Sequence, residues 1–382
     1  MGEAPRPADV PQGAAQAAVP AVHSNVRAFH LRGSSPEGHE AATHAWVVAE
    51  VARLMRLPLH DDRVAAGVGG FYVPDETLTA AHAAHLGVRS AADLLGGVVP
   101  HAFVATKAIS HPLVDADAQA PAGWQPALGA ALAAVTLPGY TAFNAADARR
   151  GYARLCQGGP VRLKLSHGVG GMGQVLLDDA SALEVALARL PAVELTRHGV
   201  VLERHLQQPT SFSVGEMHCA GVTIAYCGTQ TVTRDGRGRE AYGGSELQVI
   251  RGTLATLLEQ ALPPRQRTAV MKARDYDRLV AAAYPGFFAS RRNYDVIDGV
   301  VQDGTSVCGV LEQSWRVGGA TPAELAAVAA FQQAPTLQRV IAATVERYGA
   351  QPPPPAGAQV YYVGEAPQIG LLTKYRYMRS AQ

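Results

Sequence analysis

Cysteine is scarce in this sequence, and its few cysteines lie far apart. Only Cys156, Cys219, Cys227 and Cys308 occur among 382 residues, and no two of them form a CxxC pair. Neither a paired-cysteine zinc motif nor a redox motif is therefore indicated. A reducing, cytoplasmic setting is the simplest expectation for such a chain.

An excess of charge of one sign is also missing. The 33 lysines and arginines are balanced by 32 acidic residues, which leaves a formal net charge of +1. This balance argues against nucleic acid as a partner, because electrostatic binding of nucleic acid usually needs a basic patch or a high isoelectric point.

Long apolar runs are absent too. No run approaches the roughly 18 apolar residues of a transmembrane helix, so no membrane partner is expected. The first 22 residues are rich in alanine and proline but lack a basic segment followed by an apolar core. They predict a disordered tail rather than a signal peptide.

What remains has the composition of an ordinary globular protein. Apolar residues make up 48% of the chain and charged residues 17%, and the length allows two or three packed units. Helical spacing predicts helices at 40–57, 77–85, 145–155, 181–190, 265–284, 318–330 and 336–348. Alternation predicts strands at 69–74, 161–166, 200–206 and 360–363, a long strand or hairpin at 213–227, and a strand–turn–strand unit over 293–316. Residues 242–252 predict a glycine loop.

The most distinctive stretch runs from Val161 to Leu177. It begins as an alternating strand and continues into a loop with four glycines in six residues, at 168, 170, 171 and 173. A hairpin turn needs only two residues, so this loop contains more glycine than turning requires. Its amides could converge on phosphate oxygens, with Lys164 as a fixed cation. A mobile surface hairpin with a solvated lysine is the alternative.

Two other places combine charge with suitable spacing. Lys107 lies among apolar and small residues, where it could bind phosphate or extend its ammonium to water. Asp295 and Glu312 lie on opposite sides of the turn at 302–304, so antiparallel pairing could bring their carboxylates together. Two acids near Arg316 suit a magnesium–nucleotide site, and a charged hairpin face is the alternative.

The order of these parts resembles the ATP-grasp superfamily: an apolar lysine, a strand lysine with a glycine loop, an apolar strand with Glu203, and then two acids followed by an arginine. Leu202-Glu-Arg-His-Leu206 is similar to the hinge strand of the biotin carboxylase branch. The longer signatures Tyr-Gly-Gly-Ser-Glu-Leu and Leu-Glu-Gln-Ser-Trp-Arg-Val-Gly-Gly-Ala resemble a bacterial ATP-grasp-like family of unassigned function.

The resemblance implies an α/β and α+β chain with an ATP-grasp fold and a small N-terminal α/β (pre-ATP-grasp) domain. The divisions expected are a disordered tail (1–25), the N-terminal domain (26–106), a first ATP-grasp subdomain with the glycine loop (107–205), a second with the metal site (206–350), and a C-terminal segment with a proline run and a strand (351–382). The nucleotide would lie between the two ATP-grasp subdomains.

Carried over by position, the resemblance assigns a role to each motif residue. The nucleotide ligands would be Lys107, Lys164, Gly168, Gly170, Gly171, Gly173 and Glu203, with the backbone of Arg204, His205 and Leu206 at the adenine. One or two Mg²⁺ ions would be held by Asp295, Glu312 and Ser314. Arg316 and Lys164 would act on the transferred phosphate.

Two positions depart from the pattern of the superfamily. Ser314 stands where the superfamily usually has an asparagine that binds the metal, and a hydroxyl is a weaker oxygen donor. Thr210 stands where an acidic residue commonly binds the ribose. Nucleotide binding is still expected despite both departures, whereas catalysis would be affected by them.

The function implied is ATP- and Mg²⁺-dependent ligation, in which a carboxylate is activated as an acyl-phosphate and attacked by an amine or a thiol. Arg251, Arg291 and Arg292 are candidates for binding the carboxylate substrate, since guanidinium suits bidentate contact; surface salt bridges are the alternative. The partners expected are small molecules, and a homodimer is the commonest assembly. The other functions considered are biotin carboxylase-like carboxylation, nucleotide binding without catalysis, and a structural protein whose glycine loops are only turns.

Overall fold

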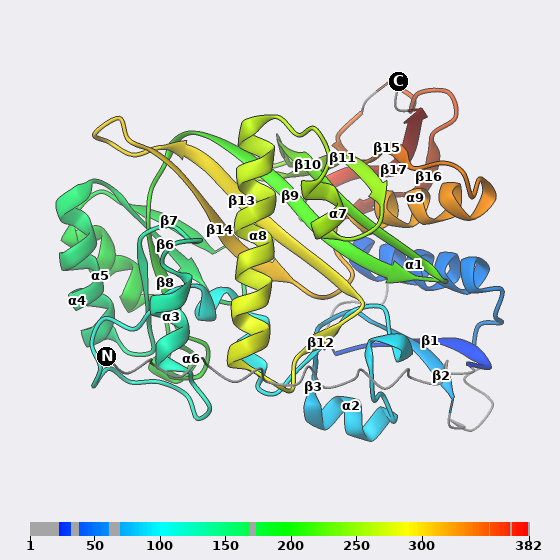
Figure 1. Ribbon diagram of the computed structural model, residues 1–382. Helices are drawn as coiled ribbons and strands as arrows, with labels where there is room; N and C mark the ends of the chain where they lie inside the picture. The colour runs from blue at the N-terminus through cyan, green and yellow to red at the C-terminus, as the bar shows by residue number, and fades with distance from the viewer. Residues whose placement is uncertain are drawn as a thin grey trace, which may run out of the picture.

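The computed structural model describes residues 23–31, 38–60, 69–168, 173–350, 352–366 and 369–380. Helices and strands are mixed throughout these ranges, and the strands form separate sheets of two, three, four and eight strands. The expected mixture of α/β and α+β structure is confirmed (Figure 1). Within the described part of the chain, no helix has both the length and the apolar character needed to cross a membrane.

The N-terminal part contains two small sheets. Strand β1 (Asn25–Phe29) pairs in parallel with β2 (Gly70–Pro74), and helix α1 (His39–Met55) connects this region to the rest of the molecule. The second sheet has the order β12–β4–β3 and consists of Phe288–Ala289, Gly97–Val99 and Leu78–Thr79. The helix predicted at 77–85 begins later, as α2 (Ala80–Leu86), because its first residues join this sheet and Thr79 caps the helix.

A four-stranded sheet with the order β5–β8–β6–β7 carries the glycine hairpin. Its strands are Gly139–Ala142, Val200–Arg204, Val161–Leu165 and Gln174–Leu177. The surrounding helices are α3 (Pro126–Leu132), α4 (Ala145–Leu155), α5 (Ala180–Ala188) and α6 (Ala192–His198). Leu163 and Leu202 lie in the apolar core shared with α4 and α5. Because side chains alternate along a strand, Lys164 and Glu203 lie together on the other face.

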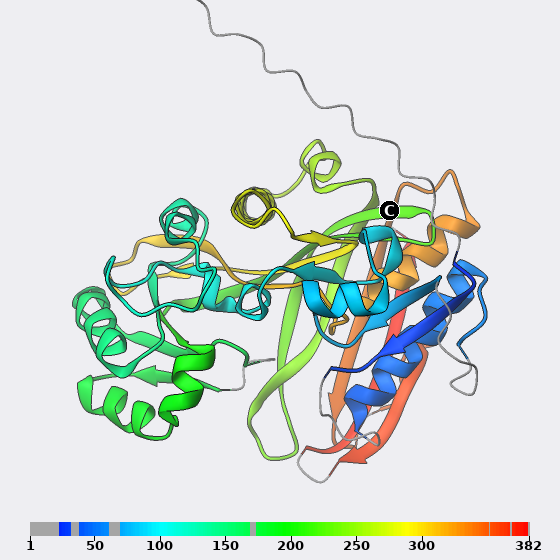
Figure 2. The same cartoon turned by 90° about the horizontal axis from the view of Figure 1, so that it is seen from below.

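The largest sheet has eight antiparallel strands in the order β14–β13–β9–β10–β11–β15–β17–β16. In this order they are Ser306–Ser314, Arg291–Val300, Gln207–Cys219, Val222–Arg234, Glu240–Arg251, Arg339–Tyr348, Gly370–Ser380 and Gln359–Ala366. Helices α7 (Leu254–Leu258) and α8 (Pro264–Ala283) pack on one face. Helix α9 (Thr321–Gln333) and α1 cover the opposite face (Figures 1 and 2).

Two predictions from local sequence are wrong within this sheet, and a third is confirmed. Residues 336–348 were expected to be a helix, but they form β15 between β11 and β17. The glycine loop expected at 242–252 is part of strand β11, which pairs with β10 and β15. In both cases pairing with neighbouring strands outweighs local propensity. The strand expected at 360–363 is confirmed as part of β16, which pairs with β17.

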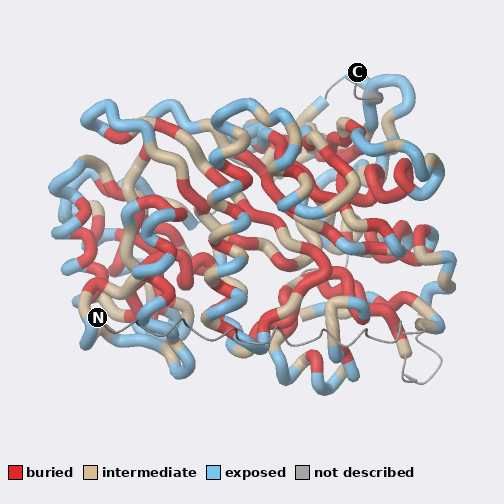
Figure 3. The backbone as a smooth tube through the Cα atoms, viewed as in Figure 1, coloured by how far each residue is buried: buried red, intermediate tan, exposed pale blue. Residues whose placement is uncertain are grey.

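Two apolar cores lie on the two faces of the large sheet. The core under α8 includes Tyr276, Tyr294 and Trp315, and the core under α9 includes Tyr226 and Phe331. Figure 3 shows the buried backbone running through the middle of both halves of the molecule. The sheet therefore forms a rigid platform between two packed layers.

One ion pair lies inside the core under α9. Arg291 and Glu324 are 1% and 0% exposed, and their side chains meet with N–O distances of 2.6 and 2.9 Å. The Tyr226 hydroxyl also donates to the Glu324 carboxylate. This pair ties the first turn of α9 to strand β13.

We predict that Glu324→Gln lowers the free energy of unfolding by about 3–5 kcal/mol, because it leaves the buried Arg291 guanidinium without its counter-charge. Urea denaturation checks the value. The control is Glu184→Gln, which breaks the exposed Arg149–Glu184 pair at 2.7 Å and is expected to change stability very little. Equal effects of the two substitutions would contradict the prediction.

Candidate functional site

Asp295 and Glu312 face each other across strands β13 and β14. They form a register pair next to an irregularity in the ladder, between Asp295 and Val296. The tight turn at 302–304 sets this register, so the juxtaposition expected from the sequence is confirmed. The Glu312 side chain is 27% exposed, so the pair is accessible from solvent.

Asp295 and Glu312 are neighbouring carboxylates whose negative charges repel each other. Burial and the neighbouring Glu312 carboxylate raise the pKa of Asp295 to about 7, against opposing effects of Gln230, Lys107 and Arg316. The Gln230 amide on β10 donates to Asp295 Oδ1 at 2.5 Å. Gln230 was not identified from the sequence, because it belongs to no motif and reaches Asp295 from two strands away.

Lys107 joins this pair from a short 3-10 helix at Lys107–Ser110. Its Nζ lies 2.6 Å from Glu312 Oε2 and donates to the Gly168 carbonyl, also at 2.6 Å. The side chain is buried, so it does not extend to water. The ammonium connects the glycine hairpin of one sheet to the acidic pair of the other.

Gln313 fixes the segment that positions Lys107 beside Glu312. Its amide donates to the carbonyls of Val104 and Thr106, at 2.9 and 2.8 Å, while its oxygen accepts from the Tyr276 hydroxyl. Gln313 follows Glu312 in the strand, and successive side chains point to opposite faces. One strand therefore positions both the acid and the segment that carries its lysine.

Lys164 and Glu203 form a second buried pair on the inner face of the four-stranded sheet. Lys164 Nζ lies 2.5 Å from Glu203 Oε1, and His111 Nε2 lies 3.2 Å from Glu203 Oε2. Burial opposes ionisation of Glu203, but Lys164 and then His111 outweigh it and lower the pKa of Glu203 to about 2. The carboxylate expected at the adenine is thus engaged with Lys164 and His111.

The glycine loop is described only at its two ends. Gly173 has φ of +72°, a left-handed conformation that favours glycine, and its carbonyl accepts from the Leu165 amide at 3.0 Å. Gly168 presents its carbonyl to Lys107. Gly170 and Gly171 lie outside the described residues.

The backbone amides of the three hinge residues, Arg204 to Leu206, differ in whether they already have hydrogen-bond partners. The amides of Arg204 and His205 donate to the carbonyls of Pro138 and Pro160. The amide of Leu206 donates to no described residue, and the Leu206 side chain is buried with Leu137 and Val301. Of these three backbone donors, Leu206 is the one left for a ligand.

Ser314 and Arg316 follow Glu312 along the chain. Ser314 pairs with Asn293, two register positions from the acidic pair and therefore on the same face as Glu312. Arg316 Nε lies 3.5 Å from Glu76 Oε2, and its guanidinium also donates to the Val317 carbonyl at 2.7 Å. Arg291 fixes both residues through their carbonyls.

The three arginines predicted to bind a substrate do not gather at this site. Arg291 is buried against Glu324, so it holds the fold together instead of facing a substrate. Arg292 lies on the α8 face, opposite Asp295, with its Nε 3.1 Å from Asp277. Arg251 donates to the Phe331 carbonyl at the end of α9. Their physical roles are structural, which local sequence did not reveal.

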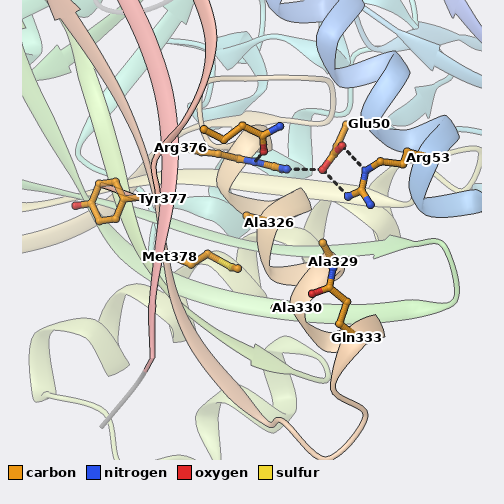
Figure 4. A pocket seen from close by; sticks show the side chains of 11 residues that line it. Glu50, Arg53, Ala326, Ala329, Ala330, Gln333, Arg376, Tyr377 and Met378 are labelled. Atoms are coloured by element: carbon orange, nitrogen blue, oxygen red, sulfur yellow. Dashed lines mark hydrogen bonds and ion pairs between the residues drawn. The ribbon is translucent and has the colours of Figure 1, made fainter. Parts of the chain in front are cut away.

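A partly open pocket lies elsewhere, between α1, α9 and β17 (Figure 4). It has a volume of about 340 Å³ and a floor of small residues from α9. On its wall, Glu50 bridges Arg53 and Arg376. These charges are already paired, and the pocket does not include Asp295 or Lys107.

The acidic pair suits a hard cation by its chemistry. In the ranges that the structure describes, no group of three or more histidine, cysteine or acidic side chains converges as a self-contained metal site would. Two carboxylates, with Ser314 two residues further along the strand, instead match the way Mg²⁺ is usually held, by few protein oxygens together with water and phosphate. Burial and the neighbouring Glu312 raise the pKa of Asp295, and a cation bound there would favour its ionised form.

Comparison with known proteins finds one family model that matches most of the chain. A family model described as "Protein of unknown function (DUF3182)" matches residues 28–376. No curated protein matches the sequence. Two solved structures are similar at low identity. D-alanyl-alanine synthetase A from Vibrio cholerae O1 biovar eltor str. N16961 has 12% identity and a TM-score of 0.45, with 79% of this chain and 91% of that chain covered.

The second is phosphoribosylamine–glycine ligase from Thermotoga maritima. It has 16% identity and a TM-score of 0.45, with 93% of each chain covered. Scores this low assign no activity to the present chain.

We predict that Asp295→Asn stabilises the metal-free protein at pH 8 but not at pH 5. Folded Asp295 keeps its proton up to about pH 7, whereas the unfolded chain loses it near pH 4. The folded state therefore binds more protons, and the free energy of unfolding falls as pH rises through this interval. The variant should avoid this loss of roughly 2–4 kcal/mol, measured by urea denaturation with a chelator.

Asp303→Asn, in the turn between the same strands, is the control. Hydrogen bonds from Thr305 lower the pKa of Asp303, so this substitution should not stabilise the protein at pH 8. A parallel pH dependence in the Asp295→Asn variant and the parent would contradict the prediction.

Proposed function

This chain belongs to the DUF3182 family of unknown function, and from its site we propose that it is an ATP- and Mg²⁺-dependent ligase of the ATP-grasp type. It would activate a small-molecule carboxylate as an acyl-phosphate and join it to an amine or a thiol. The observation that carries the proposal is the position of Lys107, between the Gly168 carbonyl and the Glu312 carboxylate.

That position brings together residues from three distant parts of the chain. A glycine-rich hairpin, a buried lysine and a pair of carboxylates are the groups that a nucleotide triphosphate with a divalent cation requires. A glycine hairpin that served only as a surface turn would need neither the buried lysine nor the pair of carboxylates. In this proposal Lys107 would contact both the phosphates and the cation site.

The cation would be held by Asp295 and Glu312, with Ser314 nearby. Bound there, Mg²⁺ would neutralise charge on the phosphates. In its absence Lys107 supplies positive charge to Glu312. Release of this lysine from Glu312 would free its ammonium for the phosphates.

The remaining residues would position the nucleotide. Lys164 lies at the base of the glycine hairpin and would exchange part of its contact with Glu203 for a phosphate oxygen. The Leu206 amide would donate to the adenine. The loop beginning at Gly168 would exclude water, which protects a reactive acyl-phosphate from hydrolysis.

The chemistry needs no protein nucleophile. A substrate carboxylate oxygen forms a bond to the γ-phosphorus, and the bond to the bridging oxygen breaks, so ADP leaves with that electron pair. An amine or thiol then forms a bond to the acyl carbon, phosphate leaves, and the attacking group loses its proton. Arg316, beside Ser314, would face the phosphate, where a guanidinium stabilises developing charge.

One observation favours a second function, nucleotide binding without turnover. Lys164 is committed to Glu203 in a fully buried pair, and Ser314 offers only a hydroxyl to a cation. Both features are compatible with a regulatory nucleotide site. Mg²⁺–ATP binding without consumption of ATP, in the presence of pooled carboxylates and amines, would favour this alternative.

We predict that Glu312→Gln and Lys107→Met abolish the stabilisation of the full chain by Mg²⁺ and an unreactive ATP analogue. A ligand specific for the folded state stabilises it by about 2.7 kcal/mol at a concentration one hundred times its Kd. Thermal unfolding with and without the analogue measures this. ATP consumption, where an active substrate pool is found, should be lost in both variants.

Lys272→Met is the matched control, because Lys272 lies on α8, which covers the face of the sheet opposite Asp295. It should respond to the analogue as the parent does. If the parent itself is not stabilised, or if Glu312→Gln responds fully, the proposed function is wrong.

A further inference from the structure

A row of polar side chains crosses the inner face of the large sheet, starting beside the acidic pair. Gln230 on β10 pairs with Ser245 on β11, Ser245 pairs with Thr344 on β15, and Thr344 pairs with Arg376 on β17. Directly opposed residues of neighbouring strands lie on the same face. Ser245 and Thr344 are buried, and their hydroxyls contact the Tyr242 and Tyr361 hydroxyls respectively.

The row ends at a second cluster of charged and phenolic groups. Lys374 on β17 is 4% exposed, and its Nζ lies 3.0 Å from Glu346 on β15, its register partner. The Tyr361 hydroxyl lies 2.8 Å from Thr344 Oγ1. Glu346 and Tyr361 are partly exposed, so the cluster is not sealed from solvent.

Tyr242 connects this cluster to the loop that follows Arg316. Its hydroxyl lies 2.6 Å from Ser245 Oγ. Its ring packs so closely on Gly319 that a Cβ there would come within 2.5 Å of it. Burial raises the pKa of Tyr242, and despite the Ser245 hydrogen bond, Glu346 and Asp295 both raise it further. Tyr242 therefore lies within electrostatic reach of both acidic groups.

One buried nitrogen in this cluster has no partner. His39, the first residue of α1, has a buried Nδ1 that bonds to no described residue. Burial and then Lys374 lower the pKa of His39, which places its ring close to the ion pair. A buried polar atom without a partner costs free energy, so a ligand atom there would be stabilising.

We propose that Lys374 and Glu346 bind the amino-acid head group of the substrate, and that the body of the substrate lies along the polar row toward Asp295. A carboxylate would pair with Lys374 and an ammonium with Glu346, which matches an α-amino acid. The three strand spacings from β10 to β17 span roughly 14 Å, so the molecule is elongated. A second carboxylate at its far end would be the group that is phosphorylated.

The class of substrate is thus an α-amino acid with a second, distal carboxylate. This inference rests on the proposed function for the fate of the distal carboxylate, but the binding of the head group can be measured without nucleotide. If the Lys374–Glu346 ion pair served only to join β15 to β17, such molecules would not bind to it.

The test is thermal unfolding of the full chain with aspartate, glutamate, α-aminoadipate and α-aminopimelate, each with and without Mg²⁺ and an unreactive ATP analogue. Pimelate, which lacks the ammonium group, is the matched ligand control. We expect α-aminopimelate to bind at least tenfold more tightly than pimelate and than aspartate. Equal binding of α-aminopimelate and pimelate, or no binding of any α-amino diacid, would overturn the inference.

The variants Lys374→Met and Glu346→Gln should each lower the affinity for α-aminopimelate at least tenfold. Stabilisation by the ATP analogue should be unchanged in both. Because each leaves one buried charge unpaired and can fail to fold, the double variant Lys374→Met/Glu346→Met replaces the pair by apolar side chains. Unchanged affinity for α-aminopimelate in the folded double variant overturns the inference.

The two proposals fail in different ways. Stabilisation by the analogue without any effect of the diacids refutes the inference and leaves the proposed function in place. Stabilisation by α-aminopimelate alone, with no effect of the analogue, supports the head-group site and refutes nucleotide-dependent ligation.

Discussion

The hydrogen bonds from the Gln313 amide to the Val104 and Thr106 carbonyls hold the two halves of the site together. The segment that they fix contains both Lys107 and His111, and these residues contact different sheets: Lys107 contacts Glu312, and His111 contacts Glu203. Gln313 is itself buried and held by Tyr276 under α8. The packing of the core under α8 is thereby coupled to the position of an ammonium group on the other face of the sheet.

The two groups of charged residues around this segment differ in their balance of charge. Lys107 contacts Glu312 and acts by its charge on Asp295, whereas Glu203 is contacted by both Lys164 and His111. In the first group, burial and Glu312 raise the pKa of Asp295, whereas in the second Lys164 and His111 lower the pKa of Glu203 despite its burial. A cation is therefore expected at the first group, and the second is suited to holding a lysine ready beside the glycine hairpin.

The sequence predicted what depends on short separations along the chain. Asp295 and Glu312 are joined by one tight turn, so alternation and turn chemistry were enough to place them opposite each other. Gln230 and Lys374 were not found, because their neighbours are set by strands that are distant in sequence. The helix expected at 336–348 failed for the same reason, since β11 and β17 determine that this alanine-containing segment is a strand. The burial of Arg291 likewise depends on its ion pair with Glu324 of α9, a contact between distant segments that no local pattern reveals.

Strand β17 lies between β15 and β16, and it holds α1 through Arg376 and Glu50, two residues separated by 326 positions. During synthesis, the growing chain must keep the hydrogen-bonding edge of β15 open until β17 has left the ribosome. Open strand edges invite pairing with other chains, and contacts of such long separation form slowly. The nascent protein is therefore exposed to mispairing between the synthesis of β15 and that of β17, because only β17 joins β15 to β16, fastens α1 and brings Lys374 to Glu346.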